Sequence, residues 1–199
     1  MERMKRAGFA TFAGLAALLS HALAAWLCGL AMPGYSHREH PLALLGAVGV
    51  PHPAWFNVFG FVLPGVLAAM AMWRFRSGMA ADARWPLRIA AQLGVLGALA
   101  FAAQGCVPLD PGDIGAPTNA LHALAWTLWW LSTSACAALL VRAANTRALR
   151  LAACAVVLLV PFLALMHWAG AMAAIAPRAS YLLWLGWIAC WPRLSRGAA

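Results

Sequence analysis

Charged residues are scarce in this chain of 199 residues, and acidic ones are the rarest. Only 10% of the residues are charged, against roughly a quarter in soluble domains, and only five are Asp or Glu. Hydrophobic residues make up 64% of the sequence. A soluble fold of this size cannot bury so much apolar surface. The composition therefore excludes an ordinary soluble domain and predicts a membrane protein.

The signatures of several common sites are also missing. No two cysteines form a CxxC pair, no HExxH pattern occurs, and no GxSxG surrounds a serine. The net charge of +9 comes without a nucleic-acid motif. A bias of basic residues toward the cytoplasm explains that charge more simply than nucleic-acid binding does.

Six apolar stretches are present, separated by short polar connections. A spanning helix takes about 20 residues, so six of them use up the chain. We expect an all-α fold with a single domain over residues 1–199, an integral membrane bundle of six transmembrane helices. The predicted helices cover residues 8–31, 54–73, 86–106, 119–141, 151–172 and 177–191. Pro86 and Pro177 suit first-turn positions, whereas Pro64 and Pro161 lie inside spans and should kink them.

The basic residues are distributed unevenly between the two sides of this topology. Of the 14 Lys and Arg residues, all but Arg38 and Arg178 fall at the termini or in connections on one side. The positive-inside rule makes that side cytoplasmic and puts both termini there, in the bacterial inner membrane. The N-terminal stretch ending in 22–24 (ALA) has an alternative interpretation as a cleaved signal peptide. Its apolar run continues to Leu30, which favours a retained helix.

The outer connections hold most of the polar groups that could do chemistry. The first, residues 32–53, contains Tyr35, Ser36 and several histidines, and its apolar middle, 41–50, should lie in the interface or fold back on the bundle. The second, residues 107–118, contains Asp110 and Asp113. Polar groups near membrane depth are expensive and suggest a functional site. The residues that we expect to line a pocket there are Tyr35, Ser36, Asn57, Asp110, His122 and Arg178.

Several chemistries are open for these residues. His122 with Asp110 could form an oriented acid–base pair, the catalytic candidates of an intramembrane enzyme. Arg178 could pair with Asp110 or Asp113, or it could bind a lipid phosphate or another anion. The aspartates could instead cap a turn.

Metal and cofactor sites are predicted only weakly. His37 and His40 are weak metal candidates, and we predict no metal site and no cofactor. Haem ligation by His122 with His167 or His21 needs matched depths, which these residues meet only loosely. His21, alone in a helix middle, should bond to a neighbouring helix. The five cysteines should be apolar, unreactive groups, although Cys28 and Cys106 could form a bridge.

The order of these motifs resembles the domain of unknown function 998 family across nearly the whole chain. The segments that carry the resemblance are 33–36 (PGYS), 40–46 (HPLALLG), 55–57 (WFN), 60–63 (GFVL), 107–112 (VPLDPG), Leu121-His122 and Arg178. The family is one of small bacterial six-helix membrane proteins without a general assigned activity. The resemblance implies the same polar set as the site, and Ala43 stands where relatives often carry serine, which disfavours a hydrolase.

These observations predict a multi-pass inner-membrane protein that binds a lipid or small amphiphile in a polar outer pocket, and they lean away from an enzyme. An intramembrane enzyme acting on a lipid or envelope precursor is the alternative. A small transporter or an accessory subunit is a further one, although the inner halves of the helices offer few polar groups. Membrane lipid, a second copy of the chain or another membrane subunit are the expected partners, and nucleic acid is not.

Overall fold

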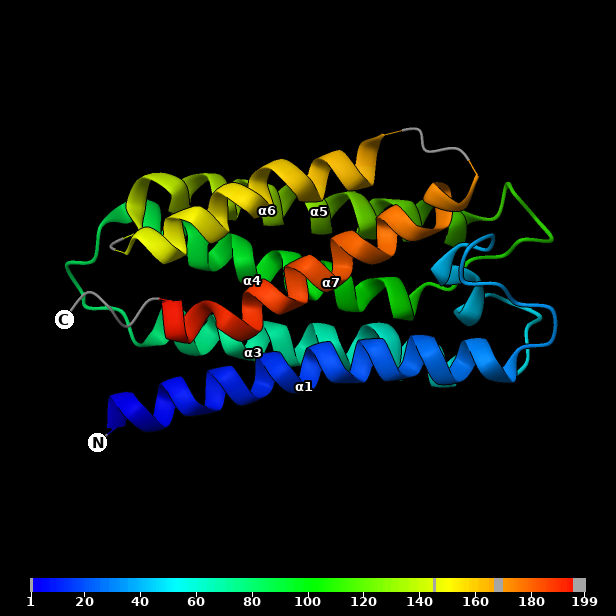
Figure 1. Ribbon diagram of the computed structural model, residues 1–199, viewed down its shortest axis with the longest axis horizontal. Coiled ribbons are helices and arrows are strands. Elements are labelled where there is room, and N and C mark those ends of the chain that lie inside the picture. The colour runs from blue at the N-terminus through cyan, green and yellow to red at the C-terminus, as the bar shows by residue number, and fades with distance from the viewer. Residues whose placement is uncertain (1, 145, 167–169, 195–199) are drawn as a thin grey trace.

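The structure, a computed structural model, describes residues 2–144, 146–166 and 170–194. Long helices lie side by side along one axis of the molecule (Figure 1). They are α1 (Glu2–Ala31), a kinked rod made of α2 (Pro53–Phe56), η2 (Asn57–Val62) and α3 (Leu63–Ser77), then α4 (Trp85–Cys106), α5 (Pro117–Ala143), α6 (Arg147–Leu165) and α7 (Ala171–Leu194). The described chain is all-α, as predicted.

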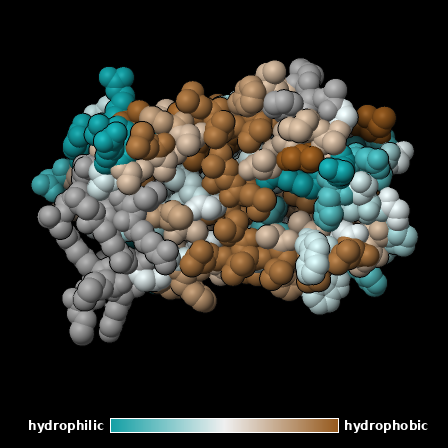
Figure 2. Space-filling model, in the orientation of Figure 1, coloured by the Kyte–Doolittle hydropathy of each residue, from teal (hydrophilic) through white to brown (hydrophobic). Residues whose placement is uncertain are grey.

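Five of these rods, all except α7, are long and apolar enough to cross a membrane. Figure 2 shows the corresponding surface on one face, with hydrophobic residues across the middle and hydrophilic residues toward both ends. Side chains such as Phe12, Leu30 and Leu158 point outward with more than half of their surface exposed. Exposed apolar side chains of this size are stable when lipid is the solvent. The chain is a multi-pass helical membrane protein.

The sixth rod, α7, lies between α1 and α6 in the bundle. It packs against α1 on one side and α6 on the other, and its Trp184, Leu185, Ile188 and Trp191 are almost fully buried. Two prolines and Arg178 interrupt its apolar sequence. Met172 and Leu182 of the same helix are more than 40% exposed, so α7 is buried on one face only.

The boundary between the last two helices was predicted wrongly. Helix α6 ends at Leu165 instead of 172, and α7 begins at Ala171 instead of 177. Gly170 takes a positive φ of 57° in the connection, which glycine adopts without strain. Pro177 therefore lies in the second turn of α7 rather than opening it, and Arg178 follows it there.

The two ends of the bundle carry different connections. The end where α1 begins and α7 ends also holds the connections 78–84 and 144–146, and we call it the basic end because Arg74, Arg76, Arg84, Arg142 and Arg147 lie there (Figure 1). The opposite end, with residues 32–52 and 107–116, is called the loop end. Within the first of these, η1 (Leu42–Gly46) buries Leu42 and Leu45 against the bundle. This confirms that the apolar middle of the connection folds back.

Small residues bring several helices into close contact. A Cβ added at Gly65 of α3 would lie 2.6 Å from the Ala102 nitrogen of α4, and one at Gly97 of α4 would lie 3.1 Å from Thr133 Oγ1 of α5. Glycine at these positions lets the backbones approach. The cysteines are all free in the structure, so the possible Cys28–Cys106 bridge is not formed.

Candidate functional site

The predicted site residues at the loop end fall into separate local arrangements. Asp110 and Asp113 both cap turns: Asp110 Oδ1 accepts from the backbone nitrogens of Gly112 (3.0 Å) and Asp113 (3.3 Å), and Asp113 Oδ1 accepts from Gly115 N (3.0 Å). This confirms the turn-capping interpretation. Asn119, in the first turn of α5, completes the loop by donating to the Asp110 and Asp113 carbonyls.

His122 is buried against the same loop but does not use Asp110. Its Nδ1 donates to the Val107 carbonyl at 2.9 Å, and its ring meets the Phe61 edge with centroids 6.1 Å apart. Only 8% of the residue is exposed. The bond ties the end of α4 to α5, so the geometry supports a structural role for His122 rather than the predicted acid–base pair.

Asn57 also joins two segments of the chain at the loop end. Its side-chain nitrogen donates to the Gly46 carbonyl at 2.9 Å, and a Cβ added at Gly46 would collide with the Asn57 amide. The contact joins η1 to the start of η2. Val48 N also donates to the Leu109 carbonyl at 2.8 Å and links the two outer connections. These bonds make the loop end one continuous cap over the bundle.

Arg178 and Tyr35 come together at this cap. Arg178 Nη2 donates to Tyr35 Oη (2.5 Å) and to the His40 carbonyl (3.0 Å), while Nη1 donates to the Ala174 carbonyl (2.5 Å). The predicted ion pair with Asp110 or Asp113 is therefore wrong, because the guanidinium reaches the first connection instead of the second. The cap is anchored to α7 by these bonds.

Ser36, His37 and His40 surround Tyr35. The His40 ring stacks on Tyr35 with centroids 5.6 Å apart, and the His37 ring meets it edge-on at 5.1 Å. Ser36 N donates to His40 Nδ1 at 3.0 Å. We call Tyr35, Ser36, His37, His40 and Arg178 the Arg178 cluster.

The electrostatics of the Arg178 cluster follow from burial and from one positive charge. Burial raises the pKa of Tyr35 and lowers the pKa of His37, and the charge of Arg178 lowers both. A neutral His37 can accept a proton or a hydrogen bond at physiological pH. Among the described residues, no group of three or more His, Cys, Asp or Glu side chains could hold a metal.

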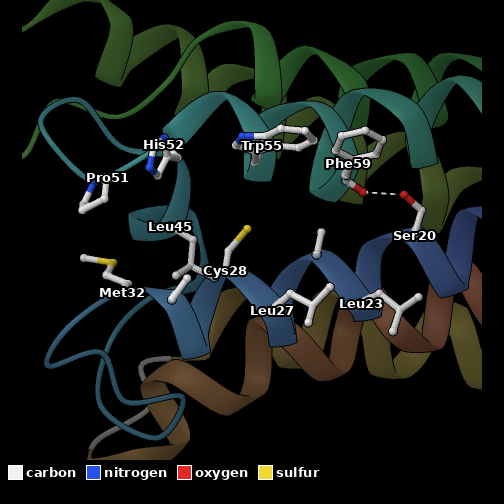
Figure 3. Close-up of a pocket in the computed structure, with 12 residues that line it drawn as sticks. Ser20, Leu23, Leu27, Cys28, Met32, Leu45, Pro51, His52, Trp55 and Phe59 are labelled. Carbon is white, nitrogen blue, oxygen red and sulfur yellow. Dashed lines mark hydrogen bonds between the residues drawn. The ribbon is translucent and has the colours of Figure 1, made fainter.

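A groove lies between α1 and the α2–η2 rod near the loop end (Figure 3). It has a volume of about 470 Å³, within the range of ligand pockets. Its walls are mostly apolar, and none of the six predicted site residues lines it. The lining residues are Ser20, Leu23, Ala24, Leu27, Cys28, Ala31, Met32, Leu45, Pro51, His52, Trp55 and Phe59. We call it the α1–α2 groove.

The inner end of the groove is closed by polar bonds across the two helices. Ser20 Oγ donates to the Phe59 carbonyl at 2.7 Å, drawn as the dashed line in Figure 3, and His21 Nδ1 donates to the Gly60 carbonyl at 2.7 Å. The predicted bond of His21 to a neighbouring helix is confirmed. The outer end is formed by Met32, Pro51 and His52.

The sequence explains why those carbonyls are available. Phe59 and Gly60 lie in η2, a π-helical segment, just before Pro64. Proline has no N–H to donate to a carbonyl four or five residues earlier, and neighbouring side chains can satisfy such freed groups in membrane helices. The predicted kink at Pro64 therefore takes the form of a π-segment held open by Ser20 and His21.

One buried polar contact between α4 and α7 was not among the predicted sites. Tyr181 Oη of α7 donates to Gln104 Oε1 of α4 at 2.8 Å, and both residues are at least 95% buried. Gln104 was visible as a polar residue within an apolar span, but its partner is 77 positions away in sequence. His167, the third histidine considered for haem, lies outside the described residues.

Comparison with known proteins returns no relatives for this chain. No family model matches it, and neither the curated proteins nor the solved structures yield a match. The resemblance to the domain of unknown function 998 family stays a prediction.

Proposed function

We propose that this protein is a six-span protein of the bacterial inner membrane that binds a lipid or small amphiphile. Both termini would be cytoplasmic and the loop end would face outward. The separation of the basic end from the loop end supports this orientation, because basic residues accumulate on the cytoplasmic side. The sixth span would be α7, which runs the length of the bundle (Figure 1).

The α1–α2 groove is the observation that carries the proposal. Its length from Ser20 to Met32 is roughly 18 Å at 1.5 Å per helical residue, close to half of a hydrocarbon core of about 30 Å. It would therefore accept one hydrocarbon chain from the outer leaflet. The apolar wall residues Leu23, Leu27 and Trp55 are partly exposed, which leaves the groove open to entry from the side.

The polar part of the amphiphile would lie at the outer end of the groove. His52 is there, with a left-handed backbone at φ 53° that turns the chain into α2. A positive φ is uncommon for a residue with a side chain. This conformation places His52 at the mouth (Figure 3), where its imidazole can hydrogen-bond a headgroup.

An experiment with two tryptophan substitutions tests the groove. Leu27→Trp should fill it, whereas Leu30→Trp adds the same bulk at an exposed position of α1 that does not line it. Native mass spectrometry of protein taken gently from its own membranes should show a bound lipid mass. We expect Leu27→Trp to lower the retained fraction at least tenfold and Leu30→Trp to leave it unchanged. Equal retention in both variants would refute the proposal.

The alternatives receive less support from the geometry. The acid–base pair of the enzyme alternative is not assembled, because His122 and Asp110 each bond to backbone groups. The resemblance to the domain of unknown function 998 family carries no activity, so it adds nothing beyond the positions of the polar residues.

A further inference from the structure

Arg178 carries a positive charge at the loop end that is matched only by neutral partners. Its three hydrogen bonds go to a phenol oxygen and to two backbone carbonyls. Among the residues that the structure describes, no carboxylate lies within ion-pair distance of it. A partly buried charge is costly unless an opposite charge or several dipoles offset it.

Hydrogen-bonding capacity is also left over in this cluster. An arginine has five N–H donors, and the three bonds of Arg178 leave Nε without a partner. His37 Nε2 is a second buried nitrogen without a partner, and it lies against Gly29 of α1. The His37 ring meets Tyr35 at 5.1 Å, and Tyr35 bonds to Arg178, so this unused capacity lies in the same cluster as one uncompensated cation. That is the chemistry of a site that accepts an oxyanion.

We propose that the Arg178 cluster binds a phosphate oxyanion, with Arg178 as the charged donor and His37 as a second contact. The planar guanidinium matches the spacing of phosphate oxygens and binds them in pairs. The cluster lies at the level of lipid headgroups in the proposed orientation. The phosphate could belong to a lipid headgroup or be free in solution.

This site is separate from the α1–α2 groove. None of its five residues lines the groove. His37 covers Gly29, whereas the groove is lined by Ser20, Leu27 and Cys28 of the same helix. The proposal therefore does not rest on the occupant of the groove.

Binding requires a small rearrangement of Tyr35. The Tyr35 hydroxyl accepts from Arg178 Nη2 and so competes with an incoming anion. Because Nε is closed off from solvent in the structure, the phosphate would displace the phenol from the guanidinium. Tyr35→Phe, which removes this competitor and keeps the ring, should preserve phosphate binding or strengthen it.

The test uses the full chain purified in detergent. One arm titrates inorganic phosphate by calorimetry, and the other compares retention of phosphatidylglycerol with that of diacylglycerol, which lacks phosphate, by native mass spectrometry. Arg178→Gln should weaken phosphate-dependent binding at least tenfold. Arg38→Gln is the matched control, because it removes an exposed arginine of the same end and should change binding less than twofold.

Each outcome has a defined meaning. Binding of inorganic phosphate that is lost in Arg178→Gln identifies a free-phosphate site, and a preference for phosphatidylglycerol alone identifies a headgroup site. Wild-type protein that binds neither ligand, or an equal loss in Arg38→Gln, overturns the proposal.

Two further variants distinguish a loss of phosphate binding from misfolding and from a loss of lipid binding in the groove. Arg178→Lys keeps the charge without the planar fork, so intermediate binding is expected even if Arg178→Gln folds poorly. Leu27→Trp should leave inorganic phosphate binding intact. A failure of the groove proposal and a failure of the phosphate proposal therefore give different patterns.

Discussion

The two halves of α1 pack in opposite ways. Near the basic end, Ala10, Ala13 and Ala17 are almost fully buried, and a Cβ added at Gly14 would lie 2.6 Å from the Cα of Ala189 in α7. Near the loop end, Leu23 and Leu27 diverge from α2 and leave the α1–α2 groove. One helix thus packs tightly against its neighbour at one end and borders a groove at the other.

The difference follows from side-chain size and from the partner helix. Small residues allow backbones to approach within contact distance, whereas the larger side chains of Leu23, Leu27, Trp55 and Phe59 line the groove. The Trp55 and Phe59 rings stack on each other with centroids 5.5 Å apart, which stiffens that wall. The η2 segment lies level with the change from the tightly packed half of α1 to the half that borders the groove. Ser20 and His21 donate hydrogen bonds to η2 at that level.

The largest expected effect comes from disturbing the tight joint. Gly14→Leu should force α1 and α7 apart, because the added Cβ meets backbone atoms that cannot move aside. We expect a loss of stability of about 3 kcal/mol or more, the upper end for overpacking. Thermal unfolding of the purified protein measures this. Gly8→Leu, where nothing lies within 4 Å of an added Cβ, should have little effect.

A smaller effect is expected at the boundary between the two halves. His21→Phe removes the donor to the Gly60 carbonyl, which Pro64 cannot replace. An unsatisfied buried carbonyl should cost about 1–2 kcal/mol. Ser20→Ala should cost less, about 0.6 kcal/mol, the average for hydrogen bonds between membrane helices. Equal unfolding temperatures for His21→Phe and wild type would show that the boundary bond does not hold the groove.

The smallest expected effect is on how stability depends on pH, and it should involve only the half of α1 that borders the groove. His37 packs over Gly29 there, and its pKa lies below the ordinary 6.5 because of burial and the Arg178 charge. A histidine with a depressed folded-state pKa contributes stability that is present above about pH 6.5 and is lost as the pH falls through that value. Unfolding temperatures at pH 8 and pH 5.5 should therefore differ more in wild type than in His37→Gln.

A titration of His37 tests the same difference between the two halves of α1. Arg178→Gln removes the neighbouring charge, so the pKa of His37 should rise, which the ring proton resonances of His37 would report by NMR. An unchanged pKa would mean that burial alone sets it. The alanine contacts of the inner half contain no titratable group and should not respond to pH.

Much of the fold could be predicted because hydropathy and proline act locally. The end of α1 and both bounds of α4 and α5 fall within two residues of the predicted spans, although α1 begins at Glu2 instead of residue 8. A π-helical segment precedes Pro64, where a kink was predicted. The α6–α7 boundary could not be predicted, since only His167 interrupts the apolar run across Gly170.

The candidate site was predictable in composition but not in arrangement. The sequence identified Arg178, Tyr35 and His122 as unusual polar groups near helix ends. It could not tell that Arg178 bonds to Tyr35 rather than to Asp110, because the two loops offer similar partners at similar depth. The α1–α2 groove was not anticipated, because its lining residues are ordinary apolar side chains whose divergence depends on the neighbouring helix.

The sequence by itself determined that this chain is a helical membrane protein, that most of its arginines gather at one end, and that Pro64 interrupts the regular hydrogen bonding of the second rod. These properties depend on composition and on single residues along one chain segment. The tertiary structure alone decided which polar groups meet and where two helices part. Those outcomes depend on the relative rotation and depth of helices, which the packing of distant side chains sets.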